Sequence, residues 1–330
     1  MKSTAVVILN WNGVKLLEQF LPSVLFYSKE AEIYVADNAS TDGSIAFIKS
    51  HFPSVKIIKN EQNFGFAEGY NRALDCVEEP IYALVNSDIE VSENWLQPVL
   101  ATFESEPKTA IIQPKILDFK NKKAFEYAGA AGGFIDQYGY AFCRGRIFDT
   151  IENDSEQYAT SEIFWASGAC FFIRKSVFRT LGGFDKDFFA HQEEIDLCWR
   201  AFNDGNVIKY VAESTVYHVG GATLQFGNPQ KTYLNFRNSL LMLTKNLPEK
   251  SLYTTLVIRM LLDGLAGLQL LFKGQSSHFF AVLKAHASFY KLFFSQLKKR
   301  KSEQQSQYYK VKSVVYQYYI KRRRVFKKLF

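Results

Sequence analysis

The sequence has little cysteine, and what it has is scattered. Its 330 residues include four cysteines, with no C-x-x-C pair among them. Zinc clusters and dithiol redox sites are built from closely spaced pairs, so neither kind of site is expected. We therefore expect Cys76, Cys143, Cys170 and Cys198 to be reduced and mostly buried, as free cysteines in proteins usually are.

The sequence also lacks the glycine patterns that hold phosphates in two common nucleotide-binding folds. No G-x-G-x-x-G follows the first apolar run, and G-x-x-x-x-G-K-[ST] is absent throughout. Binding of a dinucleotide, or of a nucleoside triphosphate in a P-loop, is therefore not expected.

Long uncharged apolar runs are missing too. The apolar run at residues 5–9 is too short for a secretory signal, which predicts a cytosolic protein. The most apolar segment, residues 251–274, is interrupted by Arg259 and Asp263. Its longest uncharged part is too short to cross the roughly 30 Å hydrocarbon core of a bilayer. We expect this segment to lie on or against another surface.

Positive charge is scarce in the body of the protein and concentrated at its end. Residues 298–330 carry twelve Lys or Arg and one acid, Glu303, while the first 297 residues carry 28 basic and 32 acidic side chains. The acidic body argues against a nucleic-acid groove there. The basic tail alternates charge with Val, Phe and Leu, which is typical of segments that bind anionic membranes; a solvated charge run is the alternative.

Short apolar runs alternate with amphipathic segments through the first hundred residues. The strand-like runs are 4–10, 32–37, 55–60 and 81–88, and the helix-like segments are 14–28, 43–52 and 66–77. This alternation is typical of βαβ units in a parallel sheet that is covered on both faces. The fold class is therefore predicted to be α/β.

The pattern changes further along the chain. Residues 109–162 are irregular, with turn or hairpin signals and a polar loop, and residues 163–184 predict a strand and a short helix. Another helix is expected to begin near Gln192. Long helical stretches begin at about residue 236, so we expect one domain at 1–235 and a helical, amphipathic and basic region at 236–330.

Polar residues stand at the ends of the four predicted strands, namely Asn10, Asp37, Asn60 and Asp88. In an open parallel sheet, ligands bind beside the carboxyl ends of the strands. Asp37 can accept a hydrogen bond from a nucleobase or a ribose hydroxyl. Asp88 could hold Mg²⁺ or Mn²⁺, which take one or two protein carboxylates together with phosphate oxygens. A simple turn explains the run Asn86 to Asp88 equally well.

Two further groups of ionisable residues are candidates for chemistry. Glu193, Glu194 and Asp196 stand at the start of a predicted helix, where the helix dipole alone favours acids. Three acids beside apolar residues are more than the helix dipole alone would explain. His218 ends a predicted strand and precedes a Gly-Gly pair that we expect to form a mobile loop over a ligand; a purely structural histidine is the alternative.

The order of these motifs resembles glycosyltransferase family 2, most closely its rhamnosyltransferase-like branch. The motifs lie within residues 5–221 and read VVILNWNG, VADNASTDGS, NFGFAEGYNRAL, LVNSDIEV, ASGACFFIRKSVFRTLGGFDKDFF, EEIDLCWR and YHVGG. The resemblance implies a GT-A (Rossmann-like) fold, a mostly parallel sheet flanked by helices, here with a C-terminal helical extension.

The resemblance also implies an activity. It is an inverting transfer of a sugar, rhamnose-like or another hexose, from a nucleotide-diphospho-sugar donor (dTDP- or UDP-sugar). The acceptor would be a hydroxyl of a glycan or lipid-linked molecule in cell-envelope polysaccharide synthesis. The protein would work in the cytoplasm at the inner face of the cell membrane, bound to it through the C-terminal tail, with no nucleic acid as partner.

Donor-binding and metal-binding roles carry over residue by residue. The nucleoside side would be Asn10, Asp37 and Asn38. The nucleotide and diphosphate side would be shaped by Asn63, Gly65, Phe66 and Asn71. The sugar and acceptor pocket would be lined by Ser167, Gly168 and Ala169. Asn86 and Asp88 match the family's metal motif, and the ligands of Mg²⁺ or Mn²⁺ would be Asp88 and His218.

The catalytic motif departs from the family pattern. The family usually has Glu-Asp where this chain has Glu193 and Glu194, so the base would be Glu194, with a carboxylate moved outward by roughly one C–C bond or assisted by Glu193. Asp196 would be the structural acid of the motif. The departure leaves a catalytically impaired nucleotide-sugar-binding protein as one alternative. A nucleic-acid-binding module acting through the basic tail is a second.

Overall fold

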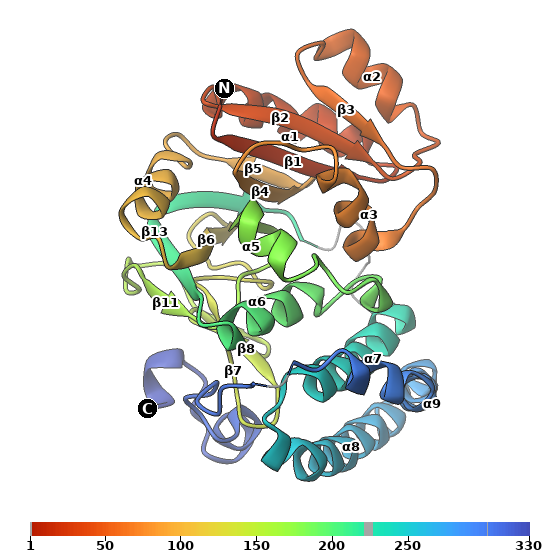
Figure 1. The fold of residues 1–330 in the computed structure, drawn as a ribbon. Coiled ribbons are helices and arrows are strands. Elements are labelled where there is room, and N and C mark those ends of the chain that lie inside the picture. The colour runs from red at the N-terminus through yellow and green to blue at the C-terminus, as the bar shows by residue number, and fades with distance from the viewer. Residues whose placement is uncertain (1, 221–226, 302) are drawn as a thin grey trace.

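The computed structural model describes residues 2–220, 227–301 and 303–330, and its centre is a nine-stranded mixed sheet (Figure 1). The strand order is β11-β13-β6-β12-β4-β1-β2-β3, with β5 paired to β13. The strands are β1 (Thr4–Asn10), β2 (Ala31–Asp37), β3 (Lys56–Lys59), β4 (Ile81–Asn86), β5 (Ile89–Val91), β6 (Thr109–Asp118), β11 (Ser161–Ile163), β12 (Cys170–Arg174) and β13 (Val207–His218). The predicted α/β class is confirmed.

Most neighbouring strands of the first half run parallel. β1 pairs in parallel with β2 on one side and β4 on the other, and β2 pairs in parallel with β3. β12 runs antiparallel between β4 and β6, and β6 is parallel to β13. Because β1 lies between β2 and β4, the order of strands reverses at β1, and the carboxyl ends of these three strands lie side by side where ligands of open α/β sheets bind.

Helices cover both faces of the sheet, as the uninterrupted apolar strands require. Alternate residues of β1 enter two separate cores: Val6 and Ile8 pack with α1 (Val14–Tyr27), α2 (Ser44–His51) and α4 (Gln97–Ser105). Ala5 and Val7 pack with α3 (Gly65–Leu74), α5 (Lys175–Thr180) and α6 (Glu193–Asn203) on the other face. Three of the four cysteines are buried as expected, and Cys76 is exposed.

The expectation that residues 109–162 are irregular is wrong for β6, which is a ten-residue strand inside the main sheet. Pro114 lies within it, and a proline normally argues against a central strand. The neighbouring strand accommodates the proline, because β13 shifts register between Val211 and Thr215, opposite Pro114.

The expected hairpin is confirmed further along the same region. β7 (Gly133–Ile135) and β8 (Ala141–Cys143) pair antiparallel. They form a second, four-stranded sheet with β9 (Arg146–Ile147) and β10 (Thr150–Ile151).

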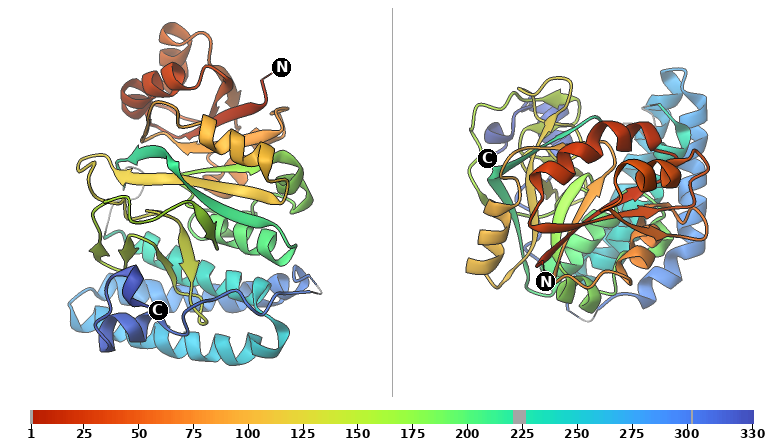
Figure 2. Two further views of the ribbon diagram at one scale, coloured as in Figure 1. Left: turned by 90° about the vertical axis from the view of Figure 1, so that its left-hand side faces the viewer. Right: turned by 90° about the horizontal axis from the view of Figure 1, so that it is seen from above.

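Three long helices follow the sheet and form a layer at one end of the molecule (Figures 1 and 2). They are α7 (Pro229–Asn246), α8 (Glu249–Phe272) and α9 (Ser276–Lys298). α7 packs against α6 and α9, and α8 packs against α9 and α7. The helical region thus begins a few residues before the predicted boundary at 236; the division into domains at 1–235 and 236–330 stays a prediction.

The basic tail is not a continuation of these helices. In the described part of residues 299–330 the chain forms two short helical turns, η2 (Tyr316–Ile320) and η3 (Phe326–Lys328), and runs back over the second sheet. The Tyr318 hydroxyl lies 2.9 Å from Thr150 Oγ1, and the Val314 N–H donates to Asp136 across 2.9 Å. The ring of Phe326 lies 5.1 Å from that of Phe134. Several apolar side chains of the tail therefore belong to the protein core.

Candidate active site

The first part of the site lies where β1 and β2 end side by side. The Asn10 side-chain amide donates to Asp37 Oδ1 across 3.1 Å, and Asp37 Oδ2 accepts from the Ser40 N–H across 3.0 Å. Both side chains are buried, and Asn10 Oδ1 has no hydrogen-bond partner. A buried unpaired acceptor is costly unless a ligand donates to it. The structure therefore brings these two predicted nucleoside residues together.

The predicted residues of the next loop hydrogen-bond to one another. The Asn38 amide donates to Asn63 Oδ1 and to the Gly65 carbonyl, each across 2.9 Å, and its own oxygen accepts from Asn60. Gly65 has φ +74°, and a Cβ there would lie 2.6 Å from Phe189. Asn38 and Asn63 thus fix the loop at the start of α3, and only glycine fits at position 65.

The two remaining candidates of this segment pack toward the second half of the domain. Both amide atoms of Asn71 bond the backbone of Phe184, donating to its carbonyl and accepting from its N–H at 2.9 Å each. The Phe66 ring packs against Tyr70 and Phe184 and would touch a Cβ at Gly168 at 3.4 Å. Asn71 therefore ties α3 to the loop after α5, while Phe66 reaches the pocket at Gly168.

The fourth strand, β4, ends at Asn86, two residues earlier than predicted, and Asp88 lies in the tight turn that leads into β5. β5 pairs antiparallel with the end of β13, with Ile89 opposite His218. This pairing places His218 Nε2 3.1 Å from Asp88 Oδ1. Asp88 can therefore be both a residue of a tight turn and a candidate metal ligand. Of the Gly-Gly pair after His218, Gly221 lies outside the described residues.

A third residue, Glu126, completes the group around the histidine. Its Oε1 lies 3.2 Å from His218 Nδ1, and its Oε2 accepts from the Ala128 N–H. All three side chains are buried. Burial disfavours a charged imidazole, but Glu126 and Asp88 outweigh it and raise the pKa of His218 to about 10. The imidazole is thus held between two carboxylates.

Asp88 and His218 could serve as donors to a divalent ion bound to a diphosphate, with the ion displacing the Nε2 proton that the two carboxylates favour on the imidazole. No group of three metal-binding side chains gathers within the described ranges. Ions such as Mg²⁺ take one or two protein ligands and complete their shell with phosphate oxygens and water. Neighbouring corners of an octahedron with bonds of about 2.1 Å lie about 3 Å apart. The observed 3.1 Å between the two donor atoms fits that spacing.

The segment Ser167–Ala169 connects the metal side of the site to the helix that carries the acids. The Asn86 N–H donates to the Ala169 carbonyl across 2.9 Å, and the Ala169 N–H donates to Ser167 Oγ across 3.2 Å. The Gly168 N–H donates to the Glu194 carboxyl group. The predicted pocket residues are therefore brought together between β4 and α6.

Glu193 and Glu194 occupy the first turn of α6, and each has a buried Oε2 with no hydrogen-bond partner. Burial raises the pKa of Glu194 to about 7, against backbone N–H groups that favour its charged form. Burial and the neighbouring Glu194 raise the pKa of Glu193 well above its usual range. A carboxyl group that titrates near neutral pH is suited to general base catalysis.

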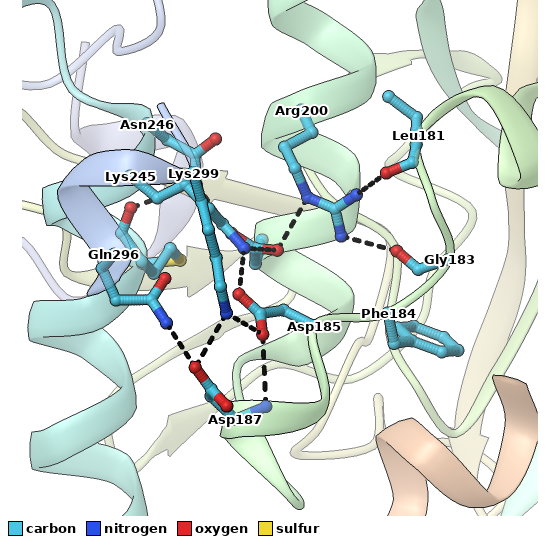
Figure 3. Close-up of polar contacts among 12 residues, drawn as sticks. Leu181, Gly183, Phe184, Asp185, Asp187, Arg200, Lys245, Asn246, Gln296 and Lys299 are labelled. Carbon is cyan, nitrogen blue, oxygen red and sulfur yellow. Dashed lines mark hydrogen bonds and ion pairs between the residues drawn. The ribbon is translucent and has the colours of Figure 1, made fainter. Parts of the chain in front are cut away.

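Asp196, on the same helix, belongs to a network of charges whose other members include Arg200, Lys245 and Asp185 (Figure 3). One oxygen lies 2.8 Å from both Arg200 Nε and Lys245 Nζ, and the other accepts from Asn246 across 2.8 Å. The same Lys245 also pairs with Asp185. These contacts join α6 to α7, which agrees with the structural role expected for Asp196.

The model of glycosyl transferase family 2 matches residues 5–182, which is more than half of the chain. The chain belongs to glycosyltransferase family 2. Among curated proteins, this glycosyltransferase is similar to the N-acetylglucosaminyl-diphospho-decaprenol L-rhamnosyltransferase of Mycobacterium tuberculosis, with 24% identity over 64% of this chain and 75% of the relative. It is also 24% identical to the low-salt glycan biosynthesis hexosyltransferase Agl10 of Haloferax volcanii, over 82% of this chain and 85% of that one.

Solved structures show the same fold as this glycosyltransferase. S. aureus TarS 1–349 in complex with UDP-GlcNAc matches 90% of this chain and 91% of that one, with a TM-score of 0.57 and 15% identity. GalNAc-T7 with UDP, GalNAc and Mn²⁺ matches 76% of this chain and 49% of that one, with a TM-score of 0.58 and 18% identity. The predicted GT-A fold is thereby confirmed.

Three residues near the site of this glycosyltransferase escaped the sequence reasoning: Glu126, which is buried, and His191 and Lys231, which are partly buried. Glu126 lies in the irregular region, where nothing in the local pattern marks it. His191 precedes the two glutamates and has a buried Nε2 with no hydrogen-bond partner. Burial, with Lys231 nearby, lowers its pKa to about 4. Lys231, at the start of α7, also interacts electrostatically with Glu126. Only His191 could have been found, from its place beside the acids.

The loop before the two glutamates has a strained backbone that α7 holds in place. Phe189, His191 and Gln192 have positive φ values of 63°, 70° and 72°. The buried Asn238 amide donates to the carbonyls of Phe188, Ala190 and His191 at 2.7–2.9 Å. Strain of this kind persists only where the surroundings enforce it, and it often marks a functional site. Asn238 is therefore a positioning residue for the start of α6.

Proposed function

We propose that the protein is an inverting, metal-dependent sugar transferase that uses a nucleotide-diphospho-sugar, dTDP- or UDP-linked, and glycosylates a hydroxyl of a lipid-linked or glycan acceptor. The sugar would be rhamnose-like or another hexose, and the product would enter cell-envelope polysaccharide synthesis. The observation that carries the proposal is that the segment Ser167–Ala169 contacts both Asn86, close in sequence to the proposed metal ligand Asp88, and Glu194, the proposed base.

The donor would bind along the carboxyl ends of β1, β2 and β4. Asn10 and Asp37 would meet the nucleoside, because Asn10 Oδ1 is a buried acceptor in need of a donor. Asp88 and His218 would hold Mg²⁺ or Mn²⁺ against the diphosphate. When bound, such an ion stabilises the negative charge that develops on the leaving nucleoside diphosphate.

Glu194 would act on the acceptor. Its unpartnered Oε2 would take the proton of the attacking hydroxyl while the new glycosidic bond forms and the bond to the diphosphate breaks. Burial and the neighbouring Glu194 raise the pKa of Glu193 well above its usual range, so the pair favours a single negative charge, which would sit on Glu194 as the base. One base without a protein nucleophile corresponds to a single displacement, which inverts the anomeric centre.

The relatives support the class of substrates. The mycobacterial relative is named for transfer of L-rhamnose to a diphospho-decaprenol-linked sugar, and solved structures of the same fold hold UDP-GlcNAc, or GDP-Man with Mn²⁺. An enzyme with a lipid-linked acceptor carries out its transfer reaction at a membrane. We therefore propose a cytoplasmic protein that is peripheral at the inner face of the cell membrane.

A ligand panel followed by a transfer assay tests the proposal. Thermal shifts are recorded with UDP-, dTDP- and GDP-sugars, each with and without Mn²⁺, since a ligand at 100 times its Kd adds roughly 2.7 kcal/mol of stability. One donor should stabilise the protein only with the ion, and that donor should be hydrolysed or transferred by the wild type but not by Glu194→Gln. Binding without turnover in the wild type would instead identify an impaired nucleotide-sugar-binding protein. No stabilisation by any nucleotide sugar would refute the proposal.

A further inference from the structure

In the long apolar helix α8, the two charges in the middle of the apolar run point inward, and many of its apolar side chains point outward. Arg259 and Asp263, which interrupt the apolar run in the sequence, are 3% and 1% exposed. The Arg259 guanidinium donates to the Tyr138 carbonyl across 2.8 Å and to Ser239 Oγ across 2.7 Å. The two charges therefore anchor α8 to the protein, and they do not interrupt its outer side.

The outer side of the helix pair is a continuous apolar surface, which we call the α8–α9 apolar face. It consists of Tyr253, Val257, Leu261, Leu265, Leu268 and Phe272 of α8, with Phe280, Leu283, Tyr290 and Phe294 of α9. The α8 residues recur every three or four positions, so they form one stripe. Leu261 is 66% exposed, and Phe272, at the turn between the helices, is 87% exposed. Soluble monomers rarely expose a contiguous surface of this kind without a partner.

Of the exposed charged residues on α8 and α9, only Glu249, at the start of α8, is acidic, and the rest are lysines. From Gly264 to Ser302 the sequence contains seven Lys or Arg and no acid. On α9, Lys284, Lys291 and Lys298 are exposed and follow one another at seven-residue spacing, beside the exposed aromatic residues. Basic side chains flanking an aromatic and aliphatic face are typical of helices that lie in the interface of an anionic bilayer.

The basic tail contributes charge at the same end of the molecule (Figures 1 and 2). Residues 321–324 read Lys-Arg-Arg-Arg and are all exposed. The tail's apolar residues Phe326 and Leu329 are buried against the protein, so they are not available as membrane anchors. The tail still exposes Ile320 and Phe330 (67% and 62%), but the α8–α9 apolar face at the same end groups ten exposed apolar side chains and is the larger candidate for the apolar contact.

We propose that the α8–α9 apolar face docks on an anionic lipid bilayer, with α8 and α9 lying in the plane of the interface and the surrounding lysines and the tail cations against the lipid headgroups. A second copy of this chain fits less well, because two such faces would bring mainly positive charges together. A spanning role for α8 also fits less well. The helix is long and apolar enough to cross by length and composition, but crossing would expose Arg259 and Asp263 to lipid.

The docking depends on the proposed function in one respect: its purpose would be to bring the site to a lipid-linked acceptor. The binding test therefore uses no donor and no acceptor. The full chain is sedimented with phosphatidylglycerol vesicles and with phosphatidylcholine vesicles, at low and at physiological salt. We expect strong binding to the first, weak binding to the second, and weaker binding as salt rises.

Two variants separate the apolar and the charged contributions. Leu261→Ser/Leu265→Ser/Phe272→Ser should lower the partition coefficient on phosphatidylglycerol at least tenfold. Lys321→Gln/Arg322→Gln/Arg323→Gln/Arg324→Gln should lower it and flatten its salt dependence. Phe26→Ser is the matched control, because Phe26 is 64% exposed but lies on α1 at the other end of the molecule (Figure 1). The control should bind like the wild type, and all variants should keep the thermal midpoint of the wild type.

Other occupants of the face give different results. Loss of a dimer in sedimentation velocity by the apolar variant, with no vesicle binding by the wild type, would overturn the proposal in favour of a second copy. Resistance of the bound protein to alkaline carbonate would overturn it in favour of a span. Vesicle binding by a protein that transfers no sugar would leave the docking intact and count against the proposed function alone.

Discussion

The Nε2 atom of His218 lies 3.1 Å from a carboxylate oxygen of Asp88, although 129 residues separate them in the sequence. The pairing of β5 with the end of β13 produces this contact, and Glu126 holds the other ring nitrogen at 3.2 Å. A carboxylate on the far nitrogen of a metal-binding histidine fixes the orientation of its ring and makes it a better ligand. The three residues would therefore form a preorganised half of the proposed metal site.

Loss of Glu126 should weaken metal binding without removing a ligand. We expect Glu126→Gln to weaken Mn²⁺ binding, measured by electron paramagnetic resonance with UDP present, by about 10- to 100-fold. Asp88→Asn should abolish it while leaving the circular dichroism spectrum unchanged. Glu90→Gln is the control, since Glu90 is a partly exposed partner of Lys122 on neighbouring β5. An Mn²⁺ affinity of Glu126→Gln equal to that of the wild type would refute the role of Glu126.

The rate of transfer should depend on the protonation of Glu194. Because only the deprotonated carboxylate can accept the hydroxyl proton, kcat should fall as pH falls below about 7, the value to which burial raises the pKa of Glu194. Glu194→Gln should lower kcat by about 10²- to 10⁴-fold and leave the Kd of the donor unchanged. Glu193→Gln serves as the comparison. Glu193→Gln should shift the midpoint of the pH profile and retain a higher kcat than Glu194→Gln. If Glu194→Gln kept the kcat and the pH profile of the wild type, Glu194 would be excluded as the base.

The same buried carboxyl group should cost stability at high pH. Its pKa rises from an ordinary 4.5 to about 7 in the folded state, so its contribution to stability is complete below the lower value and is lost as pH rises through the higher one. The shift corresponds to about 3 kcal/mol. Glu194→Gln cannot ionise and should raise the thermal midpoint relative to wild type at pH 8 but not at pH 4. An equal change in the midpoint at both values would contradict the assignment.

The sequence predicts those parts of the fold that depend on local pattern. The boundaries of β1 are correct to the residue, since an uninterrupted apolar run ends at a polar Asn10. Asp88 could be identified from the sequence as well, because the end of a parallel strand is where ligands bind. Strand β6 could not be predicted, because Pro114 argues against a central strand. Only the register shift in β13 makes room for the proline.

The remaining features depend on contacts between distant segments. Nothing near Glu126 in the sequence reveals that it will face His218, which is 92 residues away. Arg259 and Asp263 interrupt an apolar run, and only the packing of α8 shows that they turn inward. The buried side of a helix is set by its neighbours, so the exposed apolar stripe of α8 becomes visible only in the folded chain.

Asn238 should position the catalytic helix through the strained loop before it. Asn238→Ala removes the donor to the Phe188, Ala190 and His191 carbonyls, and the strained backbone should relax. We expect kcat to fall at least tenfold while the donor Kd stays the same, because Asn10, Asp37 and the metal pair are untouched. Asn206→Ala, which also removes an amide donor to a backbone carbonyl, is the matched control. Equal kcat in both variants would reduce Asn238 to a purely structural residue.

The buried pair Arg259 and Asp263 should show strong coupling in a double-mutant cycle. Arg259→Leu leaves Asp263 buried without its cation, which should lower the free energy of unfolding by about 3–5 kcal/mol. Arg259→Leu/Asp263→Leu removes both charges and should be destabilised by less than the first variant alone, because apolar residues can replace a buried ion pair at little cost. Urea denaturation of the wild type, both single variants and the double variant gives the coupling energy. Additive effects would mean that the two charges act independently, so that the inward turn of α8 rests on packing and on the Arg259 contacts with Tyr138 and Ser239.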